Sequence, residues 1–108
     1  MDSAVLSQFR SIIGDDQVLD SAEDLSVYAY DGTATLRVAP ACVLLPETVQ
    51  QVAAIMTVAH SQRLPVITRG SGTGLAGGAV PVEGGIVLCL VRMDRIIEVD
   101  EANLAMVV

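Results

Sequence analysis

The sequence predicts an α+β domain, with an α/β-like βαβ unit and additional strands, preceded by two short helices. Two apolar runs enclose a helical pattern between residues 41 and 68, and further apolar runs follow after residue 84. Residues 1–38 carry two short helical patterns instead. The chain has 108 residues, of which 52% are hydrophobic and 18% are charged, and this composition suits one small globular unit. We therefore expect an N-terminal helical segment over residues 1–38 and a domain over residues 39–108.

The N-terminal segment contains two patterns typical of helices. From Ser3 to Ile13, apolar residues recur along one helical face, and Gly14 marks the end of that helix. Ser21 and Asp24 form a capping-box pattern, with apolar residues following on one side. A second, short helix is therefore expected to begin there and to end before Asp31.

The central part of the chain predicts the βαβ unit. Residues 31–40 are expected to form a loop, within which the pattern allows a short strand near residues 36–38. The continuous apolar run Ala41–Leu45, bounded by prolines, is typical of a strand buried on both faces. Thr48–Gln62 reads as a helix capped by its first residue, and Val66–Thr68 follows as a second strand. This succession predicts two parallel strands joined by a right-handed crossover.

Three more strands are expected after the unit. The apolar runs that predict them are Ile86–Val91, Ile96–Val99 and Ala105–Val108. The last run ends the chain as an apolar strand, and complete domains seldom leave such a strand with an open edge. We therefore expect the chain to be the front fragment of something longer, in which residues 39–108 form the first subdomain of a domain that is truncated at its C-terminus.

Composition and charge argue against several classes of function. A net charge of −7 and an aromatic content of 3% disfavour nucleic-acid binding. The longest unbroken apolar run is far too short for a transmembrane segment, and the N-terminus lacks the features of a signal peptide. Cys42 and Cys89 each lie in an apolar run, which indicates buried thiols in a reducing compartment. These features predict a cytoplasmic protein with no nucleic-acid partner.

No catalytic or metal-binding residue is expected in this part of the protein. His60 is the only histidine of the sequence, and it lies near the C-terminal end of a predicted helix. There we expect it to interact favourably with the helix dipole or to face solvent. The carboxylates group in predicted turns and solvated faces. No nucleophile lies beside a base.

The segment RGSGTGLAGGA, residues 69–79, has five glycines in eleven positions and directly follows a predicted strand. Glycines permit positive φ and allow a ligand to approach the main chain closely. Backbone amides that turn the same way form a nest for phosphate oxygens, and ligands gather at the carboxyl ends of parallel strands. Thr73 can add a hydroxyl donor and Arg69 can add charge. The segment therefore predicts a phosphate cradle.

The same segment contains a literal match to the dinucleotide fingerprint G-x-G-x-x-G at Gly72–Gly77. That fingerprint requires a helix to begin within the motif. Here the following residues, Gly78–Gly85, include three glycines and a proline, which cannot sustain a helix. No Gly-Lys-Ser/Thr triplet is present either, which excludes a P-loop. We therefore expect no preference for NAD.

Taken together, these motifs resemble the FAD-binding domain of the vanillyl-alcohol oxidase and p-cresol methylhydroxylase (PCMH) type. Within that superfamily the chain is most similar to the flavin subunit of glycolate oxidase and to the D-lactate and D-2-hydroxyacid dehydrogenases. The resemblance covers Tyr28–Val108. It is carried by the segments Tyr30–Thr33, Pro46–Val52, Pro65–Pro81, Gly84–Leu88 and Arg92–Ile96.

The resemblance implies FAD as the cofactor, with its pyrophosphate along Gly70–Gly74 and its adenine near the turn at Pro46. It also implies a flavin-dependent oxidation of a small 2-hydroxyacid, possible partner subunits of an oxidase complex, and catalytic and metal residues beyond Val108. The residues expected to contact FAD are Arg69, Gly70, Ser71, Gly72, Thr73, Gly74, Leu75, Gly78 and Ala79.

Two other interpretations remain open at this point. A stand-alone nucleotide- or phosphate-binding module without catalysis also explains the glycine loop, and so does an inactive truncated product. Sequence beyond Val108 distinguishes them from the oxidoreductase.

Overall fold

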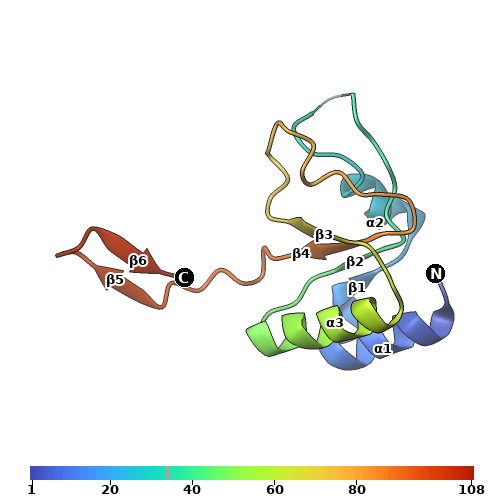
Figure 1. Ribbon diagram of the computed structural model, residues 1–108, viewed down its shortest axis with the longest axis horizontal. Helices are drawn as coiled ribbons and strands as arrows, with labels where there is room; N and C mark the ends of the chain where they lie inside the picture. Colours follow the sequence, from blue (N-terminus) through green and yellow to red (C-terminus); the bar gives the residue numbers. More distant parts are fainter. Residues whose placement is uncertain (34) are drawn as a thin grey trace.

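The computed structural model describes residues 1–33 and 35–108. Its elements run from the N-terminal helices, through the sheet, to a hairpin that stands apart (Figure 1). The helices are α1 (Ser3–Ile13), η1 (Asp15–Gln17), α2 (Ala22–Val27) and α3 (Val49–Ser61). The strands are β1 (Val18–Leu19), β2 (Cys42–Leu44), β3 (Val66–Arg69), β4 (Ile86–Cys89), β5 (Glu98–Asp100) and β6 (Ala105–Val107).

The helices begin and end where local chemistry predicts. The Asp2 side chain accepts from the Ala4 amide at the start of α1, and Gly14 ends that helix with a φ of 90°. The Ser21 hydroxyl caps α2 by accepting from the Asp24 amide. At α3 the Thr48 hydroxyl accepts from the Gln51 amide at 3.1 Å. The three predicted helices are confirmed.

The main sheet has the strand order β1-β2-β4-β3. Strands β2, β4 and β3 are parallel, so β2, α3 and β3 form the predicted parallel βαβ unit, with β4 inserted between its strands. Strand β1 pairs antiparallel with β2 at the other edge and was not predicted, because two residues are too few to show a period.

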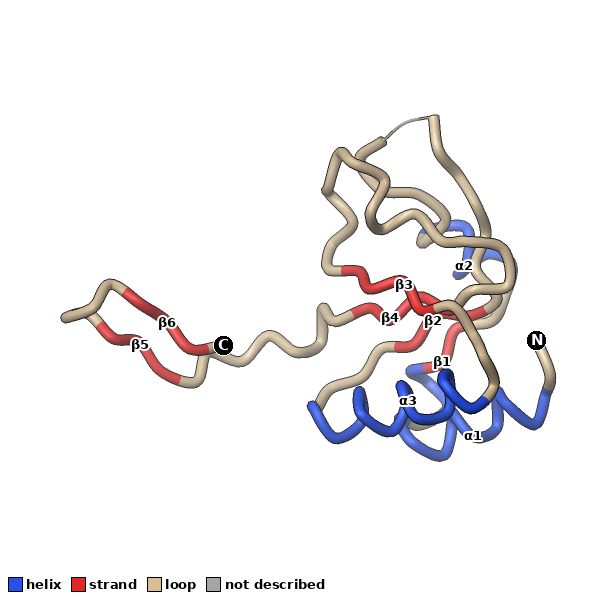
Figure 2. Tube along the Cα trace, in the orientation of Figure 1, coloured by secondary structure: helices blue, strands red, loops and turns tan. Residues whose placement is uncertain are grey.

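Both faces of this sheet are covered, which explains the continuous apolar runs. Alternate residues of β2 and β4, such as Cys42 and Leu44, pack with α1 and α3 on one face. The residues between them, such as Val43 and Cys89, pack with Leu25 and Tyr28 from α2 and its end. Figure 2 shows α1 and α3 on one side of the sheet and α2 with the long loops on the other. The N-terminal helices thus share the core of the sheet, and the boundary at residue 38/39 stays a prediction.

One other expectation is overturned in the structure, whereas the two strands predicted at the C-terminal end are confirmed. The strand expected near residues 36–38 is wrong: these residues have no regular structure, although the Val38 amide donates to the Ala29 carbonyl at 2.9 Å. Strands β5 and β6 form an antiparallel hairpin separate from the main sheet. Every residue of β6 is exposed, so this apolar hairpin has no cover in the described part of the chain.

Candidate functional site

The glycine loop leaves the sheet at the carboxyl end of β3. Arg69 is the last residue of that strand, and its carbonyl accepts from the Leu90 amide at 2.9 Å. The Cys89 thiol lies 3.7 Å from the Gly70 carbonyl oxygen, which ties the first loop residue to β4. The loop therefore begins at the end of the parallel strands, the position at which α/β sheets gather ligands.

The glycines of the loop fall into two classes. Gly72 and Gly77 have φ of 75° and 77°, a left-handed conformation that favours glycine. Gly70, Gly74 and Gly78 are not left-handed, and a Cβ added at any of them would meet no atom within 4 Å. The fold itself therefore does not require glycine at these three positions. Open space on the Cβ side of the backbone is what a closely bound ligand needs.

A second segment, Tyr28–Thr33, lies against the loop. The two stretches run side by side above the sheet, on the face opposite α1 and α3 (Figure 2). The Gly32 amide donates to the Gly74 carbonyl at 2.8 Å. A Cβ on Gly32 would lie 2.7 Å from that oxygen, a distance that real Cβ atoms essentially never show. Glycine at position 32 therefore allows the two backbones to touch.

Arg69 joins the same two segments from below. Its guanidinium donates to the Tyr30 carbonyl and lies 5.3 Å from the centre of the Tyr28 ring. The residue is only 7% exposed. A Cβ on Gly72 would lie 2.0 Å from its Nη2 atom, so the loop passes directly over the guanidinium. The predicted role of Arg69 as a charge for phosphate stays a prediction.

Asp31 is a buried carboxylate beneath the loop, with 5% of its surface exposed. Its Oδ1 atom accepts from the Thr33 amide at 2.7 Å, whereas its Oδ2 atom has no hydrogen-bond partner among residues 1–33 and 35–108. The pKa of Asp31 is lowered, mainly by the Thr33 amide and further by the amides of Ala79 and Gly77. The carboxylate is therefore ionised at neutral pH.

The structure places the remaining predicted site residues on the accessible side of the loop. Ser71, Thr73 and Leu75 are exposed, together with Gly70, Gly74 and Gly78, whereas Gly72 and Ala79 are half-buried. The sequence analysis did not include Tyr30, Asp31 or Gly32 among the site residues. The one available signal was the Asp31-Gly32 pair, because a glycine outside a predicted hairpin can indicate a close contact between backbones.

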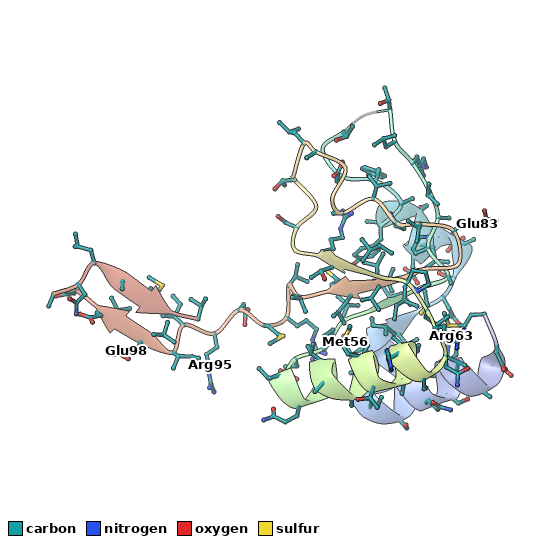
Figure 3. The ribbon with its side chains drawn as sticks, viewed as in Figure 1. Met56, Arg63, Glu83, Arg95 and Glu98 are labelled. Carbon is teal, nitrogen blue, oxygen red and sulfur yellow. The ribbon has the colours of Figure 1, made fainter. Side chains whose placement is uncertain are left out.

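A separate groove of about 660 Å³ lies near the ends of β2 and β4 and the start of α3. Arg92 organises one wall: its guanidinium donates to the Leu45 carbonyl at 3.0 Å and to the Glu47 carboxylate at 3.2 Å. Arg95 lines the groove from the segment that leads to the hairpin, where Figure 3 shows its side chain pointing outward. The turn at Pro46, where the resemblance places adenine, directly precedes the groove residues.

Two further observations concern the described residues as a whole. No three His, Cys, Asp or Glu side chains within residues 1–33 and 35–108 are grouped so as to hold a metal ion. Over the same residues, every helix falls short of the length and apolar character that crossing a bilayer demands.

Comparisons with known proteins agree with the predicted family. A family model described as an FAD binding domain matches residues 40–108. The glycolate oxidase subunit GlcD of Escherichia coli K12 is 39% identical over 98 residues, which cover 91% of this chain and 20% of the relative. A probable mitochondrial D-2-hydroxyglutarate dehydrogenase of Oryza sativa subsp. japonica is 35% identical over 103 residues, covering 95% of this chain and 18% of the relative.

A solved structure shares the fold. The crystal structure of p-cresol methylhydroxylase with bound substrate superposes with a TM-score of 0.77 at 28% identity, covering 90% of this chain and 20% of that one. The predicted PCMH-type α+β fold and the prediction of FAD as cofactor are thereby confirmed. The chain spans about one fifth of the length of the curated relatives it matches. It belongs to the family of FAD binding domains.

Proposed function

We propose that the chain is the N-terminal FAD-binding part of a flavin-dependent 2-hydroxyacid oxidoreductase of the glycolate oxidase or D-lactate dehydrogenase kind. Glycolate, D-lactate and D-2-hydroxyglutarate, which the names of its relatives carry, are all 2-hydroxyacids. Bound FAD would supply the hydride acceptor for their oxidation. Because the chain covers a fifth of these relatives, its share of the work is to hold the cofactor, and the residues that act on the substrate would come from elsewhere.

The observation that carries the proposal is the open side of the glycine loop. Gly70, Gly74 and Gly78 leave space where any other residue would place a Cβ, directly after β3. We assign the pyrophosphate of FAD to this side, along Gly70–Gly74, with Leu75, Gly78 and Ala79 lining the same channel. Backbone amides suit an anion here because they can bind phosphate oxygens without a cationic side chain, and residues 70–79 contain none. Ser71 and Thr73, which are exposed, add hydroxyl donors.

The adenine half of FAD would extend toward the turn at Pro46. The groove beside that turn is bounded by the start of α3, with Arg92 on one wall. Partner subunits are proposed for the complete enzyme because the bacterial relatives are described as subunits of glycolate oxidase. The cytoplasm is proposed as its compartment because both cysteines are free thiols buried in the core.

The decisive test replaces Gly74 by valine in a protein that carries this chain together with the rest of the enzyme. A Cβ at Gly74 meets nothing within 4 Å and the backbone there is not left-handed, so the variant is expected to fold normally. It is expected to be purified without flavin, because the side chain occupies the space assigned to the pyrophosphate. Visible flavin absorbance per mole of protein measures this.

The matched control is Ala76→Val, which places the same side chain at an exposed position of the same loop outside the assigned contacts. This variant is expected to retain flavin. A Gly74→Val protein with full flavin absorbance would refute the assignment of the pyrophosphate.

A further inference from the structure

We propose that Arg69 is a positioning residue of the glycine loop: its buried guanidinium holds the loop against the Tyr28–Thr33 segment before any cofactor binds. The inference rests on the proposed function for the identity of the ligand, FAD, and adds how the loop keeps a shape that can receive it. The Tyr28–Thr33 segment lies outside residues 40–108, the region that the family model matches.

The guanidinium lies between two segments that are distant in the sequence. Its Nη1 atom donates to the Tyr30 carbonyl. Its central carbon atom lies 5.3 Å from the centre of the Tyr28 ring, within the range of a cation–π contact. A Cβ built on Gly72 would overlap the Nη2 and Cζ atoms of the same group, so the backbone of the loop lies directly against it. One planar group therefore contacts both segments.

The charge of Arg69 is held by neutral groups. Only 7% of the residue is exposed. The ion pairs among residues 1–33 and 35–108 involve Arg10 and Arg92, and none involves Arg69. Burying a guanidinium without a carboxylate is costly unless other groups compensate for the lost water. The Tyr30 carbonyl and the Tyr28 ring are such groups, so Arg69 favours the arrangement in which their segment lies against the loop.

A second contact reports on this arrangement without sharing an atom with Arg69. The Gly32 amide donates to the Gly74 carbonyl at 2.8 Å. A Cβ built on Gly32 would also lie 2.8 Å from the Thr73 carbonyl oxygen, so the two backbones touch over more than one residue of the loop. If the guanidinium holds the two segments together, its removal weakens the hydrogen bond of Gly32. If this contact is sufficient by itself, the hydrogen bond persists.

The geometry of the guanidinium distinguishes positioning from a simple charge effect. Arginine presents several N–H donors in a planar fork, whereas the ammonium of lysine is a compact point charge. An ammonium that binds the Tyr30 carbonyl leaves the places of Nη2 and Cζ beside Gly72 empty. Arg69→Lys therefore keeps a charge that could act on a phosphate but loses the bridge between the segments.

The first test uses the 108-residue chain without any cofactor and measures hydrogen exchange of individual amides by NMR. In Arg69→Met, exchange at the Gly32 amide is expected to become at least tenfold faster. The amides of Val43 and Val87, in the paired strands β2 and β4, are expected to exchange as in the wild type, which separates a local effect from global unfolding. Unchanged exchange at Gly32 would overturn the proposal.

The matched control is Arg63→Met, which makes the same replacement at an exposed arginine just after α3. It is expected to leave exchange at Gly32 unchanged. Acceleration at Gly32 as large as in Arg69→Met would overturn the specific role of Arg69.

A measurement on the wild-type chain decides the question if Arg69→Met fails to fold. The guanidinium N–H groups of Arg69 are expected to give separate, slowly exchanging NMR resonances, because the group is buried and bound to the Tyr30 carbonyl. Those of the exposed Arg63 are expected to be averaged by rotation and exchange with water. An averaged signal for Arg69, like that of Arg63, would overturn the proposal.

The second test asks whether the positioned loop serves FAD. In the complete enzyme, Arg69→Met and Arg69→Lys are each expected to weaken FAD binding at least tenfold, measured by the quenching of flavin fluorescence. Arg63→Met is expected to bind FAD as the wild type does.

The other outcomes of this test are distinct. Wild-type affinity in Arg69→Lys alone would mean that the charge serves FAD, and it would overturn the positioning role. Wild-type affinity in both Arg69 variants would overturn the link to the cofactor. A wild-type enzyme that binds no FAD would instead refute the proposed function, and the exchange experiment would still report on the loop.

Discussion

Gly72 is a position at which a single added methyl group should destabilise the free protein. Its φ of 75° is left-handed, and a Cβ there would lie 2.0 Å from Nη2 and 2.2 Å from Cζ of Arg69. The guanidinium would have to move, and it is buried between the Tyr30 carbonyl and the Tyr28 ring. Gly72→Ala therefore combines backbone strain with the loss of the contacts that attach the loop to the Tyr28–Thr33 segment.

The expected cost follows from these parts. A left-handed residue with a Cβ costs about 1–2 kcal/mol. Losing a hydrogen bond from a charged donor costs about 1.5–3 kcal/mol, and losing the contact with the aromatic ring about 0.5–1 kcal/mol. We therefore expect Gly72→Ala to lower the free energy of unfolding by about 3–6 kcal/mol. That is a large fraction of the stability of a small domain.

A double-mutant cycle with Arg69→Met separates the two parts. In that background the guanidinium contacts are already lost, so Gly72→Ala is expected to cost only the strain, about 1–2 kcal/mol. The assay is urea unfolding followed by far-UV circular dichroism, at a protein concentration where light scattering shows a monomer. Gly74→Ala, at an open position that is not left-handed, is the control and is expected to be nearly neutral. Equal costs of Gly72→Ala in the two backgrounds would refute the described coupling of Gly72 to Arg69.

Three more outcomes are expected. Titration calorimetry should show tighter binding of FAD than of NAD, because the loop leads into β4 without starting a helix; tighter NAD binding would mean that the dinucleotide fingerprint is functional. The isolated chain should bind FAD weakly and self-associate on size-exclusion chromatography with light scattering, because the hairpin leaves Leu104 94% exposed. Leu104→Asn, which also suits the positive φ at that position, should reduce the association, whereas a wild-type monomer with sub-micromolar FAD affinity would favour a self-sufficient module. Burial raises the pKa of the Cys42 thiol to about 12, above the value of a free cysteine, so the thiol binds its proton more tightly in the folded state. The free energy of unfolding should therefore fall as the pH rises above about 9, and Cys42→Ala should flatten that dependence in urea unfolding.

The amino-acid sequence by itself determined the local features of this protein. Helix ends follow from short-range chemistry, so the hydroxyl caps at Ser21 and Thr48 and the left-handed stop at Gly14 appear where the residues predict them. The strands buried on both faces follow from continuous apolar runs, since a half-exposed strand would alternate. The glycine loop after β3 follows from composition, because few other roles explain five glycines in eleven positions directly after a strand. The resemblance to the FAD-binding family rests on the same local motifs.

Tertiary structure decided which residues meet at the loop. Arg69 and Tyr30 are 39 residues apart, and no sequence periodicity connects them. The hydrogen bond from the Arg69 guanidinium to the Tyr30 carbonyl could therefore not be predicted from the sequence. The contact of Gly32 with Gly74 and the burial of Asp31 depend on the same long-range packing. Tertiary structure also decided two short segments. Strand β1 exists because its two residues pair with β2, whereas residues 36–38 pair with no strand and remain irregular. Short-range propensity fixes an element, whereas a contact between distant segments exists only after the core has brought them together.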